Sequence, residues 1–467
     1  MRPIFTLFLS LLIFFPITAS AWELHAGLTY AALREMPEIK HKSVVPVESL
    51  ATFVEKEKDG LALLLQQHET WAKKNIFAYA ALPNTLTFTG QATPDKSLQT
   101  AFQESIRINP LMNFPLFLHL EENQKNEMYS PIAKKEIMLP LLIHEPSLRF
   151  LHLPLKKINP SDKVSPLQII ATAADEPDYG MDINLWEDNN TWFGMLYRLG
   201  KQPYGNSTVI FSSQIPFHMG FFYEATSIYL VAPFLKQTYV EYRIHLYLTL
   251  AEFAFKTGHP YWGYRFLGWS LHYLQDLGQP YHSTLFPNYS ANIVIFAHLL
   301  YYLHCPLQQH LIQLITNRHF ALENYTSFSL LRSGDNPFVA ALNDESNDYI
   351  VIPYSDEYPR HFVAGHSHAL ASTVDSAIKN TFAEKYVRDP HYLFYTTEPD
   401  INLVAVSQQI NTQKLDSILI ILLQDVGRNT RNLVRYAISH SCDTGLLATD
   451  STCNKRKDPE APLDSSR

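Results

Sequence analysis

The chain has 467 residues, of which 46% are hydrophobic and 13% aromatic, enough for a large buried core and against a wholly disordered protein. The formal net charge is −8, so no basic field surrounds the chain, which argues against tight, sequence-independent binding to duplex nucleic acid. With only three cysteines, the fold is not expected to be built from disulfides.

Residues 1–21 have the composition of a secretory signal peptide. Arg2 precedes a short apolar run, and the segment ends in Ala-Ser-Ala before Trp22. The run is too short to span a membrane comfortably, so cleavage before Trp22 is expected. The later apolar segment 291–303 is also too short, and it contains His298. We therefore expect a secreted protein, extracellular or periplasmic, whose mature chain starts at Trp22.

Hydrophobic periodicity predicts that most of the mature chain is helical. Helices are expected at about 22–36, 47–75, 238–257, 261–277, 308–325, 368–386 and 415–438. Residues 80–165 mix prolines with short apolar runs and are expected to hold limited regular structure, and 333–359 is expected to be rich in loops. The predicted fold is mainly α, with one catalytic domain at 22–440, an insertion at about 47–165 and a disordered tail at 441–467.

The stretch LGWSLHYLQDLGQPYH, residues 267–282, places charged and titratable groups in an apolar helix. His272 and Asp276 are four residues apart, so a helix presents both on one face. Pro280 ends the helix and allows His282 to turn back toward that pair. Taken by itself, this stretch could also be an ordinary contact between His272 and Asp276 on a helix surface, with His282 as an unrelated loop histidine. The other motifs of the chain are needed to distinguish a functional site from such a contact.

Further candidate ligands are spread along the chain. His319 and Glu323 are again four apart on a helical pattern. Upstream, ATAADEPDYGMD offers Asp175, with Asp178 and Asp182 as rivals, and SQIPFHMGFF offers His218. Trp22 and His25 lie three apart at the mature terminus. Burying these groups together is costly unless they pair or bind metal, and zinc accepts this mixture of imidazoles and carboxylates. A terminal amine, with a pKa of about 7.7–8, could join them.

This set of motifs resembles the bacterial zinc-dependent phospholipases C. The matching features are His-x3-Asp-x5-His with Gln279-Pro280, the later His-x3-Glu-Asn, and the stretch HAGLTYAAL after an N-terminal tryptophan. The resemblance implies a mostly helical domain with three zinc ions. It implies that one ion is held by Asp175, His218, His272 and Asp276, a second by His282, His319 and Glu323, and a third by Trp22, His25 and a bridging Asp276. His41 is the alternative to His25. The number of residues that follow His282 would by itself favour His298 over His319 as the next ligand.

The resemblance further implies hydrolysis of the phosphodiester in a phospholipid, with transient contact to a membrane surface. Asp175 would orient or deprotonate the attacking water. A monomer without a stable nucleic-acid partner is expected. The related single-strand zinc nucleases and nucleotidases, which usually have aspartate in place of Glu323, are the first alternative. A metal-containing binding protein without turnover is the second.

Overall fold

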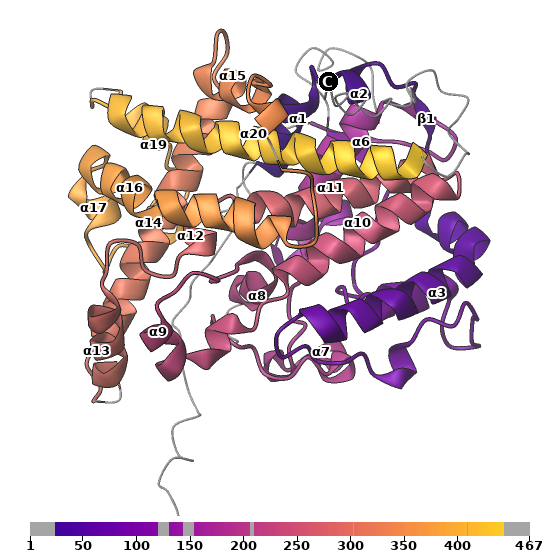
Figure 1. Ribbon diagram of the computed structural model, residues 1–467, viewed down its shortest axis with the longest axis horizontal. Coiled ribbons are helices and arrows are strands. Elements are labelled where there is room, and N and C mark those ends of the chain that lie inside the picture. Colours follow the sequence, from indigo (N-terminus) through magenta and orange to yellow (C-terminus); the bar gives the residue numbers. More distant parts are fainter. Residues whose placement is uncertain are drawn as a thin grey trace, which may run out of the picture.

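The computed structural model describes residues 24–119, 130–142, 154–205, 210–301, 303–350, 352–408 and 410–442. The predicted signal peptide, Trp22 and residues 443–467 of the predicted tail lie outside these residues. The fold is mainly helical, as predicted (Figure 1). The helices are α1 His25–Leu33, α2 Pro37–Lys40, α3 Leu50–Asn75, α4 Leu98–Ser105, α5 Lys134–Ile137, α6 Pro166–Ala174, α7 Trp192–Tyr197, α8 Ile215–His218, α9 Thr226–Val231, α10 Val240–Lys256, α11 Pro260–Leu277, α12 Pro280–Ser283, α13 Ala291–Tyr301, α14 Leu307–Leu330, α15 Pro337–Asn343, α16 Gly365–Thr381, α17 Glu384–Val387, α18 Phe394–Thr397, α19 Leu403–Val406 and α20 Gln413–Cys442.

Helix α11 lies at the centre of the molecule. Every residue from Tyr261 to Leu277 is buried, which is why this segment lacks a polar stripe. It packs on α10, α6 and α20, and α10 reaches it through a turn in which Gly258 has φ +84°, a left-handed conformation that glycine adopts at low cost. Because α11 is surrounded by protein, polar groups on it need partners inside the molecule.

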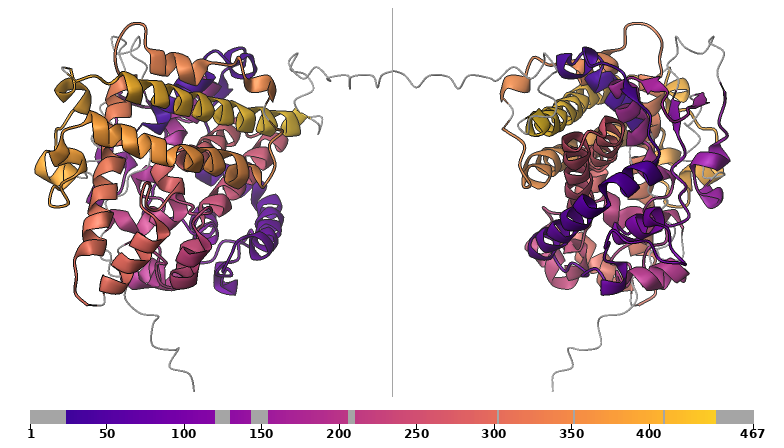
Figure 2. Two further views of the ribbon diagram at one scale, coloured as in Figure 1. Left: turned by 60° about the vertical axis from the view of Figure 1, so that its left-hand side comes forward. Right: turned by 90° about the vertical axis from the view of Figure 1, so that its right-hand side faces the viewer.

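A second apolar core lies between α14, α15, α16 and α20. Figure 2 shows α16 and α20 running side by side across this region, and the two helices are in contact. The predicted loop-rich segment 333–359 contains α15, a helix that the sequence pattern does not predict. Asn336 caps this short helix by accepting hydrogen bonds from the backbone amides of Phe338 and Val339, and Pro337 occupies its first turn.

Strands contribute little to the described residues. Strand β1 (Val45–Pro46) pairs antiparallel with β4 (Lys163–Val164), and β2 (Phe117–His119) pairs antiparallel with β3 (Leu155–Lys157). These short ribbons agree with the limited regular structure predicted for residues 80–165. Within the described ranges, none of the helices combines the length and apolarity required to cross a bilayer.

The contact between α3 and α10 contains buried imidazoles, and acid should weaken it. The ring of His245 on α10 stacks on Trp71 of α3 with 3.6 Å between centroids. Burial lowers the pKa of His245 from its ordinary 6.5 to about 4, although Asp356 partly opposes the shift. Unfolding therefore takes up a proton between these pH values, so stability falls as the pH decreases through this window.

We expect His245→Phe, which keeps an aromatic ring but does not titrate, to reduce this acid sensitivity. Between pH 7 and pH 4 the wild type should lose up to about 3 kcal/mol more free energy of unfolding than the variant. Urea unfolding at a series of pH values measures the difference. His440→Phe, at an exposed histidine, is the control. Parallel pH profiles for wild type and His245→Phe would contradict the prediction.

Candidate metal centre

Two neighbouring helices deliver the residues of the 267–282 motif to one place. His272 and Asp276 lie one turn apart on α11, and their Nε2 and Oδ2 atoms are 3.4 Å apart. The main chain leaves α11 after Leu277, and α12 begins at Pro280. His282 on α12 thereby returns toward α11, with its Nδ1 3.5 Å from Oδ1 of Asp276. The predicted helix break and the return of His282 are both present.

The first group of potential ligands is Asp178, His218 and His272, all buried. Nδ1 of His218 lies 3.1 Å from Nε2 of His272 and 4.0 Å from Oδ1 of Asp178. Oδ2 of Asp276 approaches the same His218 atom at 2.9 Å. Asp276 thus adds a second carboxylate beside the two imidazoles and Asp178, and such a mixture of donors suits zinc.

The second group is His25, His272 and Asp276. His25, in the first turn of α1, has its Nε2 3.4 Å from Oδ1 of Asp276, while its Nδ1 bonds with Oε1 of Gln275 at 2.9 Å. Asp276 therefore faces two groups with its two oxygens: Oδ2 toward His218 and Oδ1 toward His25. A carboxylate in this position can bridge two cations.

The third group is His282, His319 and Glu323, where α12 meets α14. Nε2 of His282 is 3.1 Å from Nε2 of His319, which in turn is 2.6 Å from Oε1 of Glu323. The amide of Gln279 donates to the same glutamate oxygen at 3.0 Å. His319 and Glu323 are one turn apart on α14, as their spacing predicted.

Oxygen atoms on the outer side of the centre orient the imidazoles. Nδ1 of His272 contacts the carbonyl oxygen of Ala174 at 2.7 Å, which leaves Nε2 to face the first group. Nε2 of His218 lies 3.3 Å from Oδ2 of Asp182, so its Nδ1 is the atom turned inward. Asp182 is itself held by Arg243 and Tyr273. Metal-binding histidines commonly have such partners on the second nitrogen. Sequence reasoning considered Asp182 only as a ligand and gave no signal for Arg243.

Two atoms at the centre support occupation by cations. Nε2 of His25 and Oδ1 of Asp276 are buried and have no hydrogen-bond partner among the described residues, an arrangement that is costly unless something else satisfies them. Burial, followed by the proximity of His25, keeps the pKa of His272 well below its usual value, so its imidazole is neutral. Burial raises the pKa of Asp178 to about 6. The neutral imidazole of His272 and a carboxylate that gains from a nearby cation fit a metal site.

Asp175 is in none of the three groups. It caps the C-terminus of α6, where Oδ1 accepts a hydrogen bond from the amide of Ala26 at 2.6 Å and Oδ2 lies 3.4 Å from Nε2 of His119. The following 3₁₀ turn, Glu176–Tyr179, carries Asp178 into the position expected for Asp175. Of the three acids considered from the sequence, the one that shares a potential metal group with His218 and His272 is thus Asp178, one of the two rivals.

His41 and His298, the histidines weighed against His25 and His319, lie away from the three groups. His41 is exposed and belongs to none of them. His298 is on α13 and lines a small apolar cavity. The structure therefore brings together most of the predicted set, adds Asp178 and leaves Asp175 to one side. The predicted ligands that meet are His25, His218, His272, Asp276, His282, His319 and Glu323.

Comparisons of the chain with protein-family models, with curated proteins and with solved structures found no match. The geometry of the buried side chains is therefore what supports a site. Three buried clusters of histidine, aspartate and glutamate could hold metal ions, which is compatible with three ions per chain.

Proposed function

We propose that this protein is a secreted, zinc-dependent phosphodiesterase that cleaves phospholipids in the manner of a phospholipase C. The observation that carries the proposal is the position of Asp276, whose two oxygens face separate groups of imidazoles. A carboxylate shared between two clusters is expected for a multinuclear centre and has no obvious purpose in an ordinary packed core.

In this proposal, Asp178, His218, His272 and Asp276 hold the first zinc ion, and His282, His319 and Glu323 hold the second. The third would be held by His25, Asp276 and the amine and carbonyl of Trp22, a residue outside the described ranges. Bound zinc supplies a Lewis acid that makes water nucleophilic near neutral pH and offsets charge on phosphate oxygens. Asp178 replaces Asp175 in our assignment as the carboxylate that orients the attacking water and accepts its proton.

The chain's own residues prepare the centre for this reaction. Asp182 and the carbonyl of Ala174 fix the ring orientations of His218 and His272, so little reorganisation is needed during turnover. Gln279 donates to one oxygen of Glu323 and thereby sets the direction of that carboxylate. The substrate's phosphodiester, rather than its hydrocarbon part, is the group that this polar centre can recognise.

The direct test combines elemental analysis with a headgroup-release assay. We expect up to three zinc ions per chain, hydrolysis of phosphatidylcholine to diacylglycerol and phosphocholine, loss of activity with a chelator, and recovery with zinc. Single-stranded DNA is the parallel substrate. Cleavage of DNA without cleavage of lipid would assign the protein to nuclease chemistry, and a zinc-loaded protein inert toward both would favour a binding role.

A pair of substitutions separates Asp178 from Asp175. Asp178→Asn should lower headgroup release by about 100-fold and weaken zinc binding, because it removes a charged group 4.0 Å from Nδ1 of His218. Asp175→Asn should retain the zinc content, since that side chain contacts Ala26 and His119 instead. Elemental analysis and steady-state assays of both variants measure this. The reverse ranking of the two variants would assign the water-orienting role to Asp175.

A further inference from the structure

Helices α9 and α13, with the turn that follows α13, carry a group of large apolar side chains that face solvent. We call this surface the α9–α13 face; its members are Leu230, Val231, Ile293, Phe296, Leu299 and Leu303. Leu230 is 80% exposed, Leu303 74% and Phe296 57%. The two helices are in contact and lie together at the lower edge of the molecule in Figure 1. Contiguous exposed apolar surface of this kind marks an interaction site.

The exposed positions on α13 follow a helical period. Ile293, Phe296 and Leu299 are three residues apart and therefore share a face. A solvated helix normally presents polar residues outward, but the outward face of α13 is as apolar as its inner one. Segments 226–236 and 289–310 together contain one Lys, Arg, Asp or Glu residue, Lys236. Charged side chains, which are common on an ordinary solvated face, are thus scarce in both segments.

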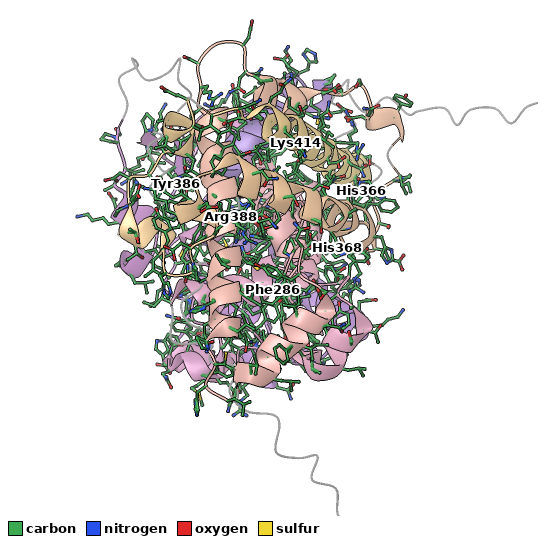
Figure 3. All side chains as sticks on the ribbon, turned by 90° about the vertical axis from the view of Figure 1, so that its left-hand side faces the viewer. Phe286, His366, His368, Tyr386, Arg388 and Lys414 are labelled. Carbon is green, nitrogen blue, oxygen red and sulfur yellow. The ribbon has the colours of Figure 1, made fainter. Side chains whose placement is uncertain are left out.

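Two small apolar cavities extend from this face toward the candidate metal centre. The first, of about 40 Å³, lies between α9, α13 and α14. The second, of about 70 Å³, has His319 in its wall. Leu235, Leu285 and Phe286 line both cavities, so the two share a wall. Figure 3 shows the side of the molecule on which Phe286 lies. The apolar region is therefore continuous from the exposed helices to a residue of the third ligand group.

We propose that the α9–α13 face docks on the surface of a phospholipid bilayer, with its apolar side chains among the upper acyl chains. The continuity of apolar lining with His319 favours lipid as the occupant, because the same molecule offers a hydrocarbon part to the apolar region and a phosphodiester to the centre. This inference rests on the proposed function for its choice of lipid. Docking itself requires only the apolar face and is measurable without turnover.

The test is flotation with vesicles of a phosphatidylcholine analogue whose glycerol-side phosphate ester is replaced by a phosphonate, which prevents hydrolysis. The triple variant Phe296→Ser, Leu299→Ser, Leu303→Ser should reduce vesicle binding by at least about tenfold. The matched control is Val44→Ser, Leu63→Ser, Ile421→Ser, at three exposed apolar positions outside the α9–α13 face. We expect the control to bind vesicles as the wild type does.

Hydrolysis of a short-chain phosphatidylcholine below its micelle-forming concentration separates this inference from the proposed function. We expect the triple variant to cleave these dissolved molecules at the wild-type rate while losing activity on vesicles. Absence of hydrolysis in every protein would refute the proposed function and leave the vesicle-binding result intact. Equal vesicle binding by wild type and triple variant would overturn the docking inference. So would a wild-type dimer, detected by light scattering, that becomes monomeric in the triple variant.

Discussion

Asp276→Asn is expected to abolish most of the activity and to reduce the zinc content while the fold persists. Asparagine keeps the size of the side chain but removes the negative charge that faces His25 and His282 through Oδ1 and His218 through Oδ2. The nearby imidazoles hold the pKa of Asp276 well below its usual range despite complete burial, so the charge is present at any pH of interest. Outer-sphere substitutions at metal sites cost about 10–100-fold, and loss of a bridging ligand should exceed about 100-fold in turnover.

The measurements for this variant are headgroup release, zinc per chain and the zinc-dependent rise in melting temperature. A ligand that binds only the folded state raises stability by about 2.7 kcal/mol at 100 times its Kd, so weaker binding reduces that rise. Asp348→Asn is the control, because this acid pairs with Arg431 and Arg435 and contacts none of the three ligand groups. Near-normal activity and zinc content in Asp276→Asn would contradict the bridging position.

The parts of the site that could be predicted from the sequence are those that a single helix determines. Four residues make about one helical turn, and this spacing brings together His272 with Asp276 and His319 with Glu323. His319 was preferred to His298 because Glu323 follows it by four residues, and the structure places His298 on α13, away from the three groups. The end of helix α11 before Pro280 could also be predicted from neighbouring residues alone, since proline cannot continue a helix.

The choice among Asp175, Asp178 and Asp182 could not be made in this way. All three are buried acids in one short segment, and their roles differ only through residues distant in sequence. The amide of Ala26 engages Asp175, and Arg243 engages Asp182, which leaves Asp178 for the two histidines. These partners come from α1 and α10. The sequence pattern of residues 170–183 does not indicate these contacts with residues distant in the chain.

The same distinction applies to the fold. Long helices such as α10, α11 and α20 were predicted because their periodic patterns extend over many residues. Helix α15 was missed because seven residues provide too few repeats, and its cap at Asn336 is visible only once the amides of Phe338 and Val339 are placed. Helix α13 was recognised only as a segment unable to span a membrane. Its exposed apolar face depends on packing against α9 and α14, which the sequence does not disclose.

Arg243→Met is expected to produce a large loss of stability and, in addition, to weaken zinc binding. Arg243 and Asp182 are both fully buried, with Nε of the arginine 3.0 Å from Oδ1 of the aspartate. The guanidinium also donates to the carbonyl oxygens of Ile106 and Arg107 at 2.7 and 2.8 Å. Removing Arg243 deprives the buried charge of Asp182 of its main counter-ion, and breaking such a buried pair costs about 3–5 kcal/mol of the free energy of unfolding.

The effect on zinc follows from the second contact of Asp182. Its Oδ2 accepts a hydrogen bond from Tyr273 at 2.6 Å and lies 3.3 Å from Nε2 of His218, so a displaced Asp182 no longer orients that imidazole. Zinc affinity at the first group should fall by about 10–100-fold. Urea unfolding in the presence of a chelator and zinc titration measure the two effects separately.

Arg431→Met is the matched control for Arg243→Met. Arg431 is also fully buried and pairs with Asp348, but it orients no imidazole of the three groups. We expect a comparable loss of stability with unchanged zinc affinity. Adding Asp182→Asn to Arg243→Met removes the buried negative charge and should recover part of the stability. Zinc affinity should stay low, because the asparagine amide interacts more weakly than a carboxylate with the N–H group of His218. Wild-type zinc affinity in Arg243→Met would show that Asp182 does not position His218.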